Sequence, residues 1–183
     1  MTDSGNRAVS EFLEYLADLI DDPQHNPSHY ADDVMGRLID GSVDGDRLSD
    51  LELIQNCIFI LNAGHETTTK LICNGVAALF EHPAQLARLQ RDPGVIDSAV
   101  EEFLRFESSN QLGNRRVAED TMVGGVAMKA GTLIYLCIGA ANRDPLQFTD
   151  PEGLNIEWRP NRHLAFNSVT HACAGMSLAR LEG

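Results

Sequence analysis

The most informative stretch of this sequence is Phe166-Asn-Ser-Val-Thr-His171-Ala-Cys173-Ala-Gly175. It joins a long irregular segment to a helical one and contains a lone cysteine. A helix is expected to begin near Ala174, and backbone N–H groups and the helix dipole at its start would favour the thiolate form of Cys173. His171 lies two residues earlier. A lone cysteine in a loop is more often inert, so this stretch alone leaves open a metal-ligating or reactive thiol and an ordinary loop residue.

A second unusual stretch, Ala63-Gly64-His65-Glu66-Thr67-Thr68, lies inside a long predicted helix. That helix is expected to begin at the capping-box pattern Ser49-Asp-Leu-Glu52, and nothing breaks it before His82-Pro83. Glycine and consecutive threonines are poor mid-helix residues, because glycine costs backbone entropy and threonine hydroxyls compete for backbone carbonyls. Such a segment can widen the helix and admit water or a small ligand. The alternative is a helix-packing glycine with solvent-facing neighbours; zinc-protease chemistry is excluded because the second His of HExxH is absent.

A third pattern is the pair Glu102 and Arg105, three residues apart on the helix that is expected after Asp92-Pro93. Residues at this spacing lie on one helical face and can form an ion pair. Most such pairs are exposed to solvent and contribute at most about 1 kcal/mol. By itself the pair therefore indicates little more than a solvated helix face.

In this order, the three patterns resemble the signature of the cytochrome P-450 superfamily, in particular of its soluble bacterial branch. The family's mid-helix pattern (A/G)-G-x-(D/E)-T is matched at 63–67 and its E-x-x-R pattern at 102–105. Its pattern F-x-x-G-x-H-x-C-x-G is matched by Phe166, His171, Cys173 and Gly175. The resemblance covers nearly the whole chain. It implies a mainly α fold with a small β component, the C-terminal part of the P-450 fold.

The resemblance also implies that residues 1–183 form a partial domain that lacks the N-terminal half and most of the last helix of that fold. Three positions depart from the family pattern. Val169 replaces the glycine four residues before the cysteine, where a Cβ disfavours the backbone conformation that is usually needed, and Asn167 stands where glycine is common. The family's third structural charge is here Gly153, and Arg159 is the nearest candidate for its role.

By this resemblance, the cofactor is haem b (iron protoporphyrin IX), with Cys173 as the axial ligand of its iron. A thiolate ligand donates electron density to the iron and favours cleavage of the O–O bond. Thr67 is expected to donate a hydrogen bond on the oxygen-binding side, and Glu66 to relay protons from solvent. The haem-binding positions carried over are Ala63, Gly64, Arg115, Phe166, His171 and Gly175, with propionate contacts for Arg115 and His171. The structural positions are Glu102, Arg105 and Arg159.

The activity that the resemblance implies is insertion of one oxygen atom of O₂ into a small organic substrate. The electrons would pass from NAD(P)H through a ferredoxin or similar redox partner. An alternative is a catalytically inactive, truncated P-450 remnant that at most binds haem. A third hypothesis, from another class, is an unrelated acidic helical interaction module.

The composition excludes other classes of protein. The formal net charge is −13, from 14 basic and 27 acidic residues, which disfavours binding to nucleic acid. The best apolar run, Cys57–Leu61, is far shorter than the roughly 18–20 residues of a membrane span, and residues 1–5 do not resemble a signal peptide. We therefore expect a cytoplasmic protein without nucleic-acid or membrane partners. Apolar surroundings predict buried thiols, not disulfides, at Cys57, Cys73 and Cys137.

Apolar periodicity predicts the remaining helices. Helical spacing is found over 8–20, and a short helix is expected over 32–39 after a loop at 21–31. Two further helices are expected to open at Pro83 and Pro93, because proline fits the first helical turn.

The period changes after the E-x-x-R pattern. Strands are expected over 121–126 and 132–138, paired as a hairpin around a turn at 128–131. Residues 142–165 show no clear period and predict an unusually long coil, a kind that tends to be functional.

Overall fold

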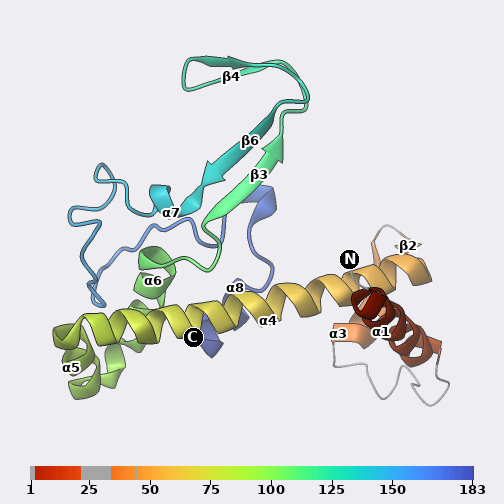
Figure 1. Ribbon diagram of the computed structural model, residues 1–183, viewed down its shortest axis with the longest axis horizontal. Helices are drawn as coiled ribbons and strands as arrows, with labels where there is room; N and C mark the ends of the chain where they lie inside the picture. The colour runs from red at the N-terminus through yellow and green to blue at the C-terminus, as the bar shows by residue number, and fades with distance from the viewer. Residues whose placement is uncertain (1–2, 22–33, 44) are drawn as a thin grey trace. The chain divides into compact units, whose positions relative to one another are not determined.

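The computed structural model of the protein describes residues 3–21, 34–43 and 45–183 (Figure 1). The chain divides into two compact units, Met1–Ala63 and Gly64–Gly183. The described elements are mainly α-helical with three small two-stranded sheets, which confirms the predicted fold class.

Within the described residues, the first unit contains α1, α3, a short hairpin and the beginning of the next helix. α1 (Asp3–Asp21) is longer than the predicted 8–20, and α3 (Val34–Asp40) corresponds to the predicted helix 32–39. The loop predicted at 21–31 lies outside the described residues apart from Asp21. β1 (Ser42–Val43) pairs antiparallel with β2 (Asp46–Arg47), a hairpin that the sequence pattern did not indicate.

Apolar side chains of α1, α3 and the next helix form the interior of this unit. Leu16 and Leu53 are buried. Around them, these three helices enclose an apolar hollow, lined among others by Phe12, Leu16, Met35, Leu38, Cys57 and Leu61.

The longest helix, α4 (Asp50–Glu81), begins with the predicted capping box. The Ser49 N–H donates to the Glu52 carboxylate at 2.9 Å, and the Glu52 N–H donates back to the Ser49 hydroxyl at 3.4 Å. The helix ends one residue before His82, the N-cap of the following helix. It has α geometry throughout, so the widening expected near residues 63–68 is not present.

The core of the second unit lies between α4 and the helices that follow it. α5 (Pro83–Arg91) and the short 3₁₀ turn η1 (Pro93–Val95) lead into α6 (Ile96–Phe106), as Figure 1 shows. The buried core residues come from α4, α6 and the coil beyond residue 150; they are Leu71, Ala78, Leu79, Ala99, Val100, Phe103, Leu104, Leu154 and Ile156.

One contact sets the close approach of α4 and α6. A Cβ built at Gly75 would lie 2.7 Å from Cδ2 of the Phe103 ring, so only glycine leaves room for that ring. At Gly64, one site of the mid-helix pattern, a Cβ would meet no atom within 4 Å. The two glycines of α4 therefore have different structural roles.

The strands differ from the predicted hairpin. β3 (Leu112–Arg116) pairs antiparallel with β6 (Leu133–Cys137), and β4 (Thr121–Val123) pairs with β5 (Val126–Met128). The expected single strand at 121–126 is wrong because Gly124 and Gly125 have positive φ values of 57° and 81° and turn the chain inside it. The expected partner of residues 132–138 is therefore replaced by β3.

The predicted coil is confirmed. After the short α7 (Ile138–Ala141), residues 142–165 contain no helix or strand. A 3₁₀ turn, η2 (Val169–His171), and α8 (Met176–Glu182) complete the chain, and α8 corresponds to the helix expected near Ala174.

The prediction of buried thiols is wrong for two cysteines. Cys73 and Cys137 are exposed and Cys57 is half-buried, although all are free, as expected. Cys73 lies off the face of α4 that carries the buried Leu71 and Leu79. Cys137 ends a strand of a sheet with only two strands.

None of the helices in the described ranges is long and apolar enough to cross a lipid bilayer.

The first testable prediction compares the two glycines of α4. Gly75→Ala should lower the free energy of unfolding by about 1–3 kcal/mol, because the Phe103 ring must move in a packed core. Gly64→Ala should raise it by up to about 1 kcal/mol, since alanine is the better helix former and its Cβ enters open space. Urea unfolding of the two variants measures both values. Equal effects of the two substitutions would contradict the close approach of α4 and α6.

Candidate functional site

The side chains of Glu102 and Arg105 form a buried ion pair on α6. Arg105 Nε donates to Glu102 Oε2 and Arg105 Nη2 to Glu102 Oε1, both at 2.8 Å. Both side chains have 0% exposure. The pair is therefore not the solvated surface pair that spacing alone allows, and breaking one such buried pair typically costs about 3–5 kcal/mol.

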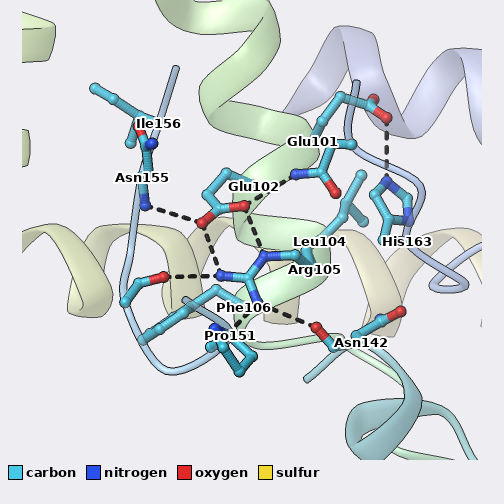
Figure 2. Close-up of polar contacts among 12 residues, drawn as sticks. Glu101, Glu102, Leu104, Arg105, Phe106, Asn142, Pro151, Asn155, Ile156 and His163 are labelled. Atoms are coloured by element: carbon cyan, nitrogen blue, oxygen red, sulfur yellow. Dashed lines mark hydrogen bonds and ion pairs between the residues drawn. The ribbon is translucent and has the colours of Figure 1, made fainter. Parts of the chain in front are cut away.

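The other hydrogen-bonding groups of this pair fasten the long coil to α6, as Figure 2 shows. Arg105 Nη1 donates to the carbonyls of Asn142 (3.1 Å) and Pro151 (2.9 Å), and Nη2 to that of Gly153 (2.9 Å). All five guanidinium N–H groups therefore have acceptors. The carboxylate of Glu102 in turn accepts from the Asn155 backbone N–H and from the Asn161 side chain, both at 2.9 Å.

The role expected for Arg159 is corrected by these contacts. Arg159 is exposed, and the residues that contact Glu102 and Arg105 do not include it. Asn161 Nδ2 supplies the extra donor to Glu102. At Gly153 it is the backbone carbonyl, not a side-chain charge, that meets Arg105. A neutral amide thus stands where a third charge was expected.

Asn142 connects Arg105 to the segment that precedes the cysteine. Its side chain is fully buried, donates to Ser108 Oγ at 2.7 Å and accepts from the Leu164 N–H at 2.7 Å. Asparagine in a long coil is common, so the sequence held no signal for this role.

The residues 166–175, here called the Cys173 loop, are held at both ends. Phe166 packs against the core, and its carbonyl accepts the Cys173 N–H at 2.9 Å. The Cys173 carbonyl accepts the Met176 N–H at 3.3 Å, at the start of α8. The Cys173 thiol is exposed and forms no disulfide. The sequence-predicted Phe166 and Cys173 are therefore brought together, with the thiol accessible to a ligand.

The glycine replacements in this loop adopt the conformation that favours glycine. Asn167 has a φ of 56° and Val169 a φ of 57°. Asparagine tolerates this left-handed region, whereas a β-branched valine there is strained. The Val169 side chain is 86% exposed, so packing offers it no compensation.

A second polar cluster, which the sequence analysis did not find, lies beside the loop. Glu101 on α6 contacts His163 from the coil and Arg180 from α8. Burial raises the pKa of Glu101, but hydrogen bonds from His163 and Arg180 outweigh this and hold it at about 2, against an ordinary value of 4.5.

The mid-helix pattern of α4 is exposed at residues 63–66, whereas Thr67 and Thr68 are half-buried. Glu66 forms an i,i+4 ion pair with Lys70 at 2.5 Å, and this hydrogen bond lowers the pKa of Glu66. Thr69 Oγ1 donates to the His65 carbonyl at 2.8 Å, which is the competition for carbonyls expected of threonines here. The Thr67 carbonyl accepts from the Ser109 hydroxyl at 2.8 Å, so this turn is tied to the segment after α6.

The remaining predicted positions lie on separate elements. Arg115 is half-buried on β3, where its Nη1 donates to the Asn114 carbonyl, and His171 is exposed on η2. Ala63 and Gly64 are exposed on α4. A Cβ at Gly175 would meet nothing within 4 Å. No described hydrogen bond or ion pair joins Cys173 directly to Thr67 or Arg115.

The described side chains limit the kind of metal centre that this chain can form. In the described ranges no group of three or more His, Cys, Asp or Glu side chains is arranged to hold a metal ion. Cys173 offers one accessible thiol, so a metal bound there would take its other ligands from a group that these side chains do not supply. Open space at Gly64 and Gly175 is compatible with a large flat ligand.

Comparison with known proteins agrees with this chemistry. The chain matches the family described as "Cytochrome P450" over residues 3–93 and 94–183. It is 42% identical over 178 residues to a protein of Bacillus subtilis (strain 168) named "Biotin biosynthesis cytochrome P450", covering 97% of this chain and 44% of that protein. It is 43% identical over 183 residues to the vitamin D(3) 25-hydroxylase of Pseudonocardia autotrophica, covering 99% and 45%.

Solved structures give the same result. P450BioI, in a complex with an acyl carrier protein that carries hexadec-9Z-enoic acid, superposes with a TM-score of 0.88 at 42% identity, covering 98% of this chain and 45% of that one. Substrate-free CYP109E1 from Bacillus megaterium gives a TM-score of 0.90 at 36% identity, covering 96% and 45%. The chain thus spans less than half the length of the relatives it matches.

A second prediction concerns strain in the Cys173 loop. Val169→Gly should raise the free energy of unfolding by about 1 kcal/mol, because glycine adopts a positive φ without a steric penalty. Val169→Ala removes most of the same exposed side chain but keeps the Cβ, so it is the matched control and should change stability little. Denaturant unfolding of both variants distinguishes them. A gain in the alanine variant equal to that in the glycine variant would show that φ is not the cause.

A third prediction follows from the depressed pKa of Glu101. A carboxylate whose pKa is lower in the folded state contributes stability above its ordinary pKa, and this contribution is lost as the pH falls from 4.5 toward about 2. Glu101→Gln should therefore be less stable than the unaltered chain at neutral pH, and the difference should shrink over that acid range. Unfolding free energies measured against pH test this. A difference independent of pH would mean that the charge of Glu101 contributes nothing.

Proposed function

Because the chain belongs to the cytochrome P450 family, we propose that it forms the thiolate-bearing part of a haem-thiolate monooxygenase. The observation that carries the proposal is the Cys173 loop, in which an accessible thiol is held at the start of α8 by the backbone of Phe166. The buried pair Glu102–Arg105 supports this loop through the coil and Asn142.

The residues available fit haem b. Cys173 would bind the iron through its sulfur, and Arg115 and His171 would offset the negative charge of the propionates. Phe166 would close one edge of the site, while Gly64, Ala63 and Gly175 would leave it unobstructed. When bound, the haem supplies a redox-active iron that activates O₂ for insertion of one oxygen atom into a small organic substrate.

The start of α8 has a defined part in this chemistry. The Cys173 carbonyl accepts the Met176 N–H at 3.3 Å, so the backbone on the helix side of the thiol is fixed as well. Since the loop backbone is fixed by the hydrogen bond from the Cys173 N–H to the Phe166 carbonyl, the sulfur has a defined position before any ligand arrives.

We expect α4 to contribute the groups that move protons. Thr67 Oγ1 is a donor that would deliver a proton toward the oxygen-binding side, and the Thr67 peptide is held by Ser109. Glu66 is exposed to solvent, and its pairing with Lys70 lowers its pKa and keeps the carboxylate ionised as a proton acceptor. Electrons would come from NAD(P)H through a ferredoxin or similar partner that docks from solution.

One observation favours the alternative of an inactive remnant that at most binds haem. Val169 occupies a left-handed conformation beside the thiol, where strain opposes the loop geometry that a ligand needs. A haem titration of this chain decides between retention and loss of the cofactor.

A fourth prediction tests the axial ligand. After reconstitution with haem, Cys173→Ser should abolish the long-wavelength Soret band that thiolate-ligated haem shows when it is reduced under CO. Cys57→Ser, Cys73→Ser and Cys137→Ser remove the other thiols and are the matched controls, which should keep the band. Retention of the band in Cys173→Ser would assign the thiolate to another residue.

A fifth prediction tests the proton-moving groups in a full-length chimera, in which this chain follows a complete homologous N-terminal half. Thr67→Ala should keep the thiolate spectrum but lower the yield of product per NAD(P)H, with hydrogen peroxide as the replacement product. Glu66→Gln should mainly slow turnover, because proton relay of this kind is typically worth about 10²–10⁴-fold in rate.

Product and hydrogen peroxide are measured per NAD(P)H consumed in both chimeric variants. An unchanged yield in Thr67→Ala would remove Thr67 from the mechanism, whatever the turnover rate of Glu66→Gln.

A further inference from the structure

We propose that Glu101, together with His163 and Arg180, positions the Cys173 thiolate by holding the two ends of the Cys173 loop together. The proposal rests on the proposed function of Cys173 as a haem ligand. Glu101 does not contact Cys173. It binds His163, which precedes the loop, and Arg180, which follows it. This cluster is separate from the buried pair of Glu102 and Arg105, although it begins on the same helix.

His163 holds the entry to the loop. Its Nε2 lies 3.1 Å from Glu101 Oε2, and its side chain is only 3% exposed. The Ala165 N–H donates to His163 Nδ1 at 3.2 Å, so Nδ1 is an acceptor and Nε2 carries the proton that is donated to Glu101. Figure 2 shows this contact between the coil and α6. Without the carboxylate, a buried N–H would lose its acceptor.

Arg180 holds the exit from the loop. From α8, its Nε donates to Glu101 Oε1 and its Nη2 to Oε2 at 3.2 Å, a two-pronged contact that defines orientation as well as distance. The same guanidinium lies over the Phe166 ring, with Cζ 4.8 Å from the ring centroid. The His163 ring also meets Phe166 edge-on, with centroids 5.8 Å apart.

These contacts converge on Phe166, which is connected directly to the cysteine. The Phe166 carbonyl accepts the Cys173 N–H, so a displacement of Phe166 is transmitted to the backbone that carries the thiol. The Glu101 carboxylate thereby holds His163 three residues before the loop and Arg180 on the helix after it, and both of these side chains contact the Phe166 ring. Glu101 is thus a positioning residue that acts on the thiolate through Phe166.

The rest of the coil does not depend on Glu101. Residues 142–161 are fastened by the buried Arg105 and Glu102, through contacts that Glu101 does not share. A local effect on the loop can therefore be distinguished from a general loss of structure.

The test uses the full 183-residue chain with Glu101→Gln, which removes the charge and one of the two acceptor oxygens but keeps the size of the side chain. The matched control is Glu157→Gln, because Glu157 also forms a long-range ion pair, with Arg88 at 2.8 Å, at a site away from the loop. Two measurements are made: hydrogen exchange of the haem-free chain, and the fraction of bound haem that shows the thiolate-type CO spectrum.

In Glu101→Gln we expect exchange at the amides of Asn167 and Cys173 to accelerate about tenfold or more, while the amide of Asn155 is unchanged. The thiolate fraction of bound haem should fall severalfold, and Glu157→Gln should match the unaltered chain in both measurements. Equal exchange in the two variants would overturn the proposal. A uniform acceleration that includes Asn155 would also overturn it, since it would show a general structural role.

The two proposals fail in different ways. If the unaltered chain gives no thiolate spectrum, and Cys173→Ser does not differ from it, the proposed function fails. The hydrogen-exchange comparison is made without haem and still decides whether Glu101 holds the loop.

Discussion

The buried ion pair of Glu102 and Arg105 is the interaction on which the second unit depends. Two opposite charges with no exposure are tolerable only if every donor and acceptor finds a partner. Here the five guanidinium N–H groups and both carboxylate oxygens are all used, mostly by the backbone of a coil that has no secondary structure of its own. The pair therefore replaces a sheet or helix as the element that orders this coil.

From that pair, order extends to the cysteine in steps. The Asn142 side chain accepts a hydrogen bond from the Leu164 N–H, and Phe166 packs on the core. The Phe166 carbonyl then accepts the Cys173 N–H. Glu101 adds a second connection, between the coil and α8. The thiol itself remains exposed, so the loop combines a hydrogen-bonded backbone with an accessible side chain.

Much of the fold follows from local signals in the sequence. The capping box at Ser49 and Glu52 and the proline at Pro83 set the ends of α4 and the start of α5, because both act through neighbouring backbone groups. The pairing of β3 with β6 was missed, since glycines at 124 and 125 create a hairpin inside the expected strand.

The polar network of the site was only half predictable. Spacing indicated that Glu102 and Arg105 could pair, but not that they are buried. The contacts of Asn142, Asn161 and His163 join residues 22 to 62 positions apart, and such contacts leave no periodic trace in a sequence. Arg159 is a further example. The family pattern predicted a third charged side chain beside Glu102 and Arg105, whereas this chain has the amide of Asn161 there.

The most direct test of the central interaction is native-state hydrogen exchange in Arg105→Lys. Lysine keeps the positive charge but has three donors in place of five, so it cannot serve Glu102 and three carbonyls at once. We expect the amides of Asn155 and Leu164 to lose their protection, while in Arg88→Lys, at an exposed ion pair, they stay protected. Retained protection at Asn155 and Leu164 in Arg105→Lys would contradict the claim that the buried pair orders the coil.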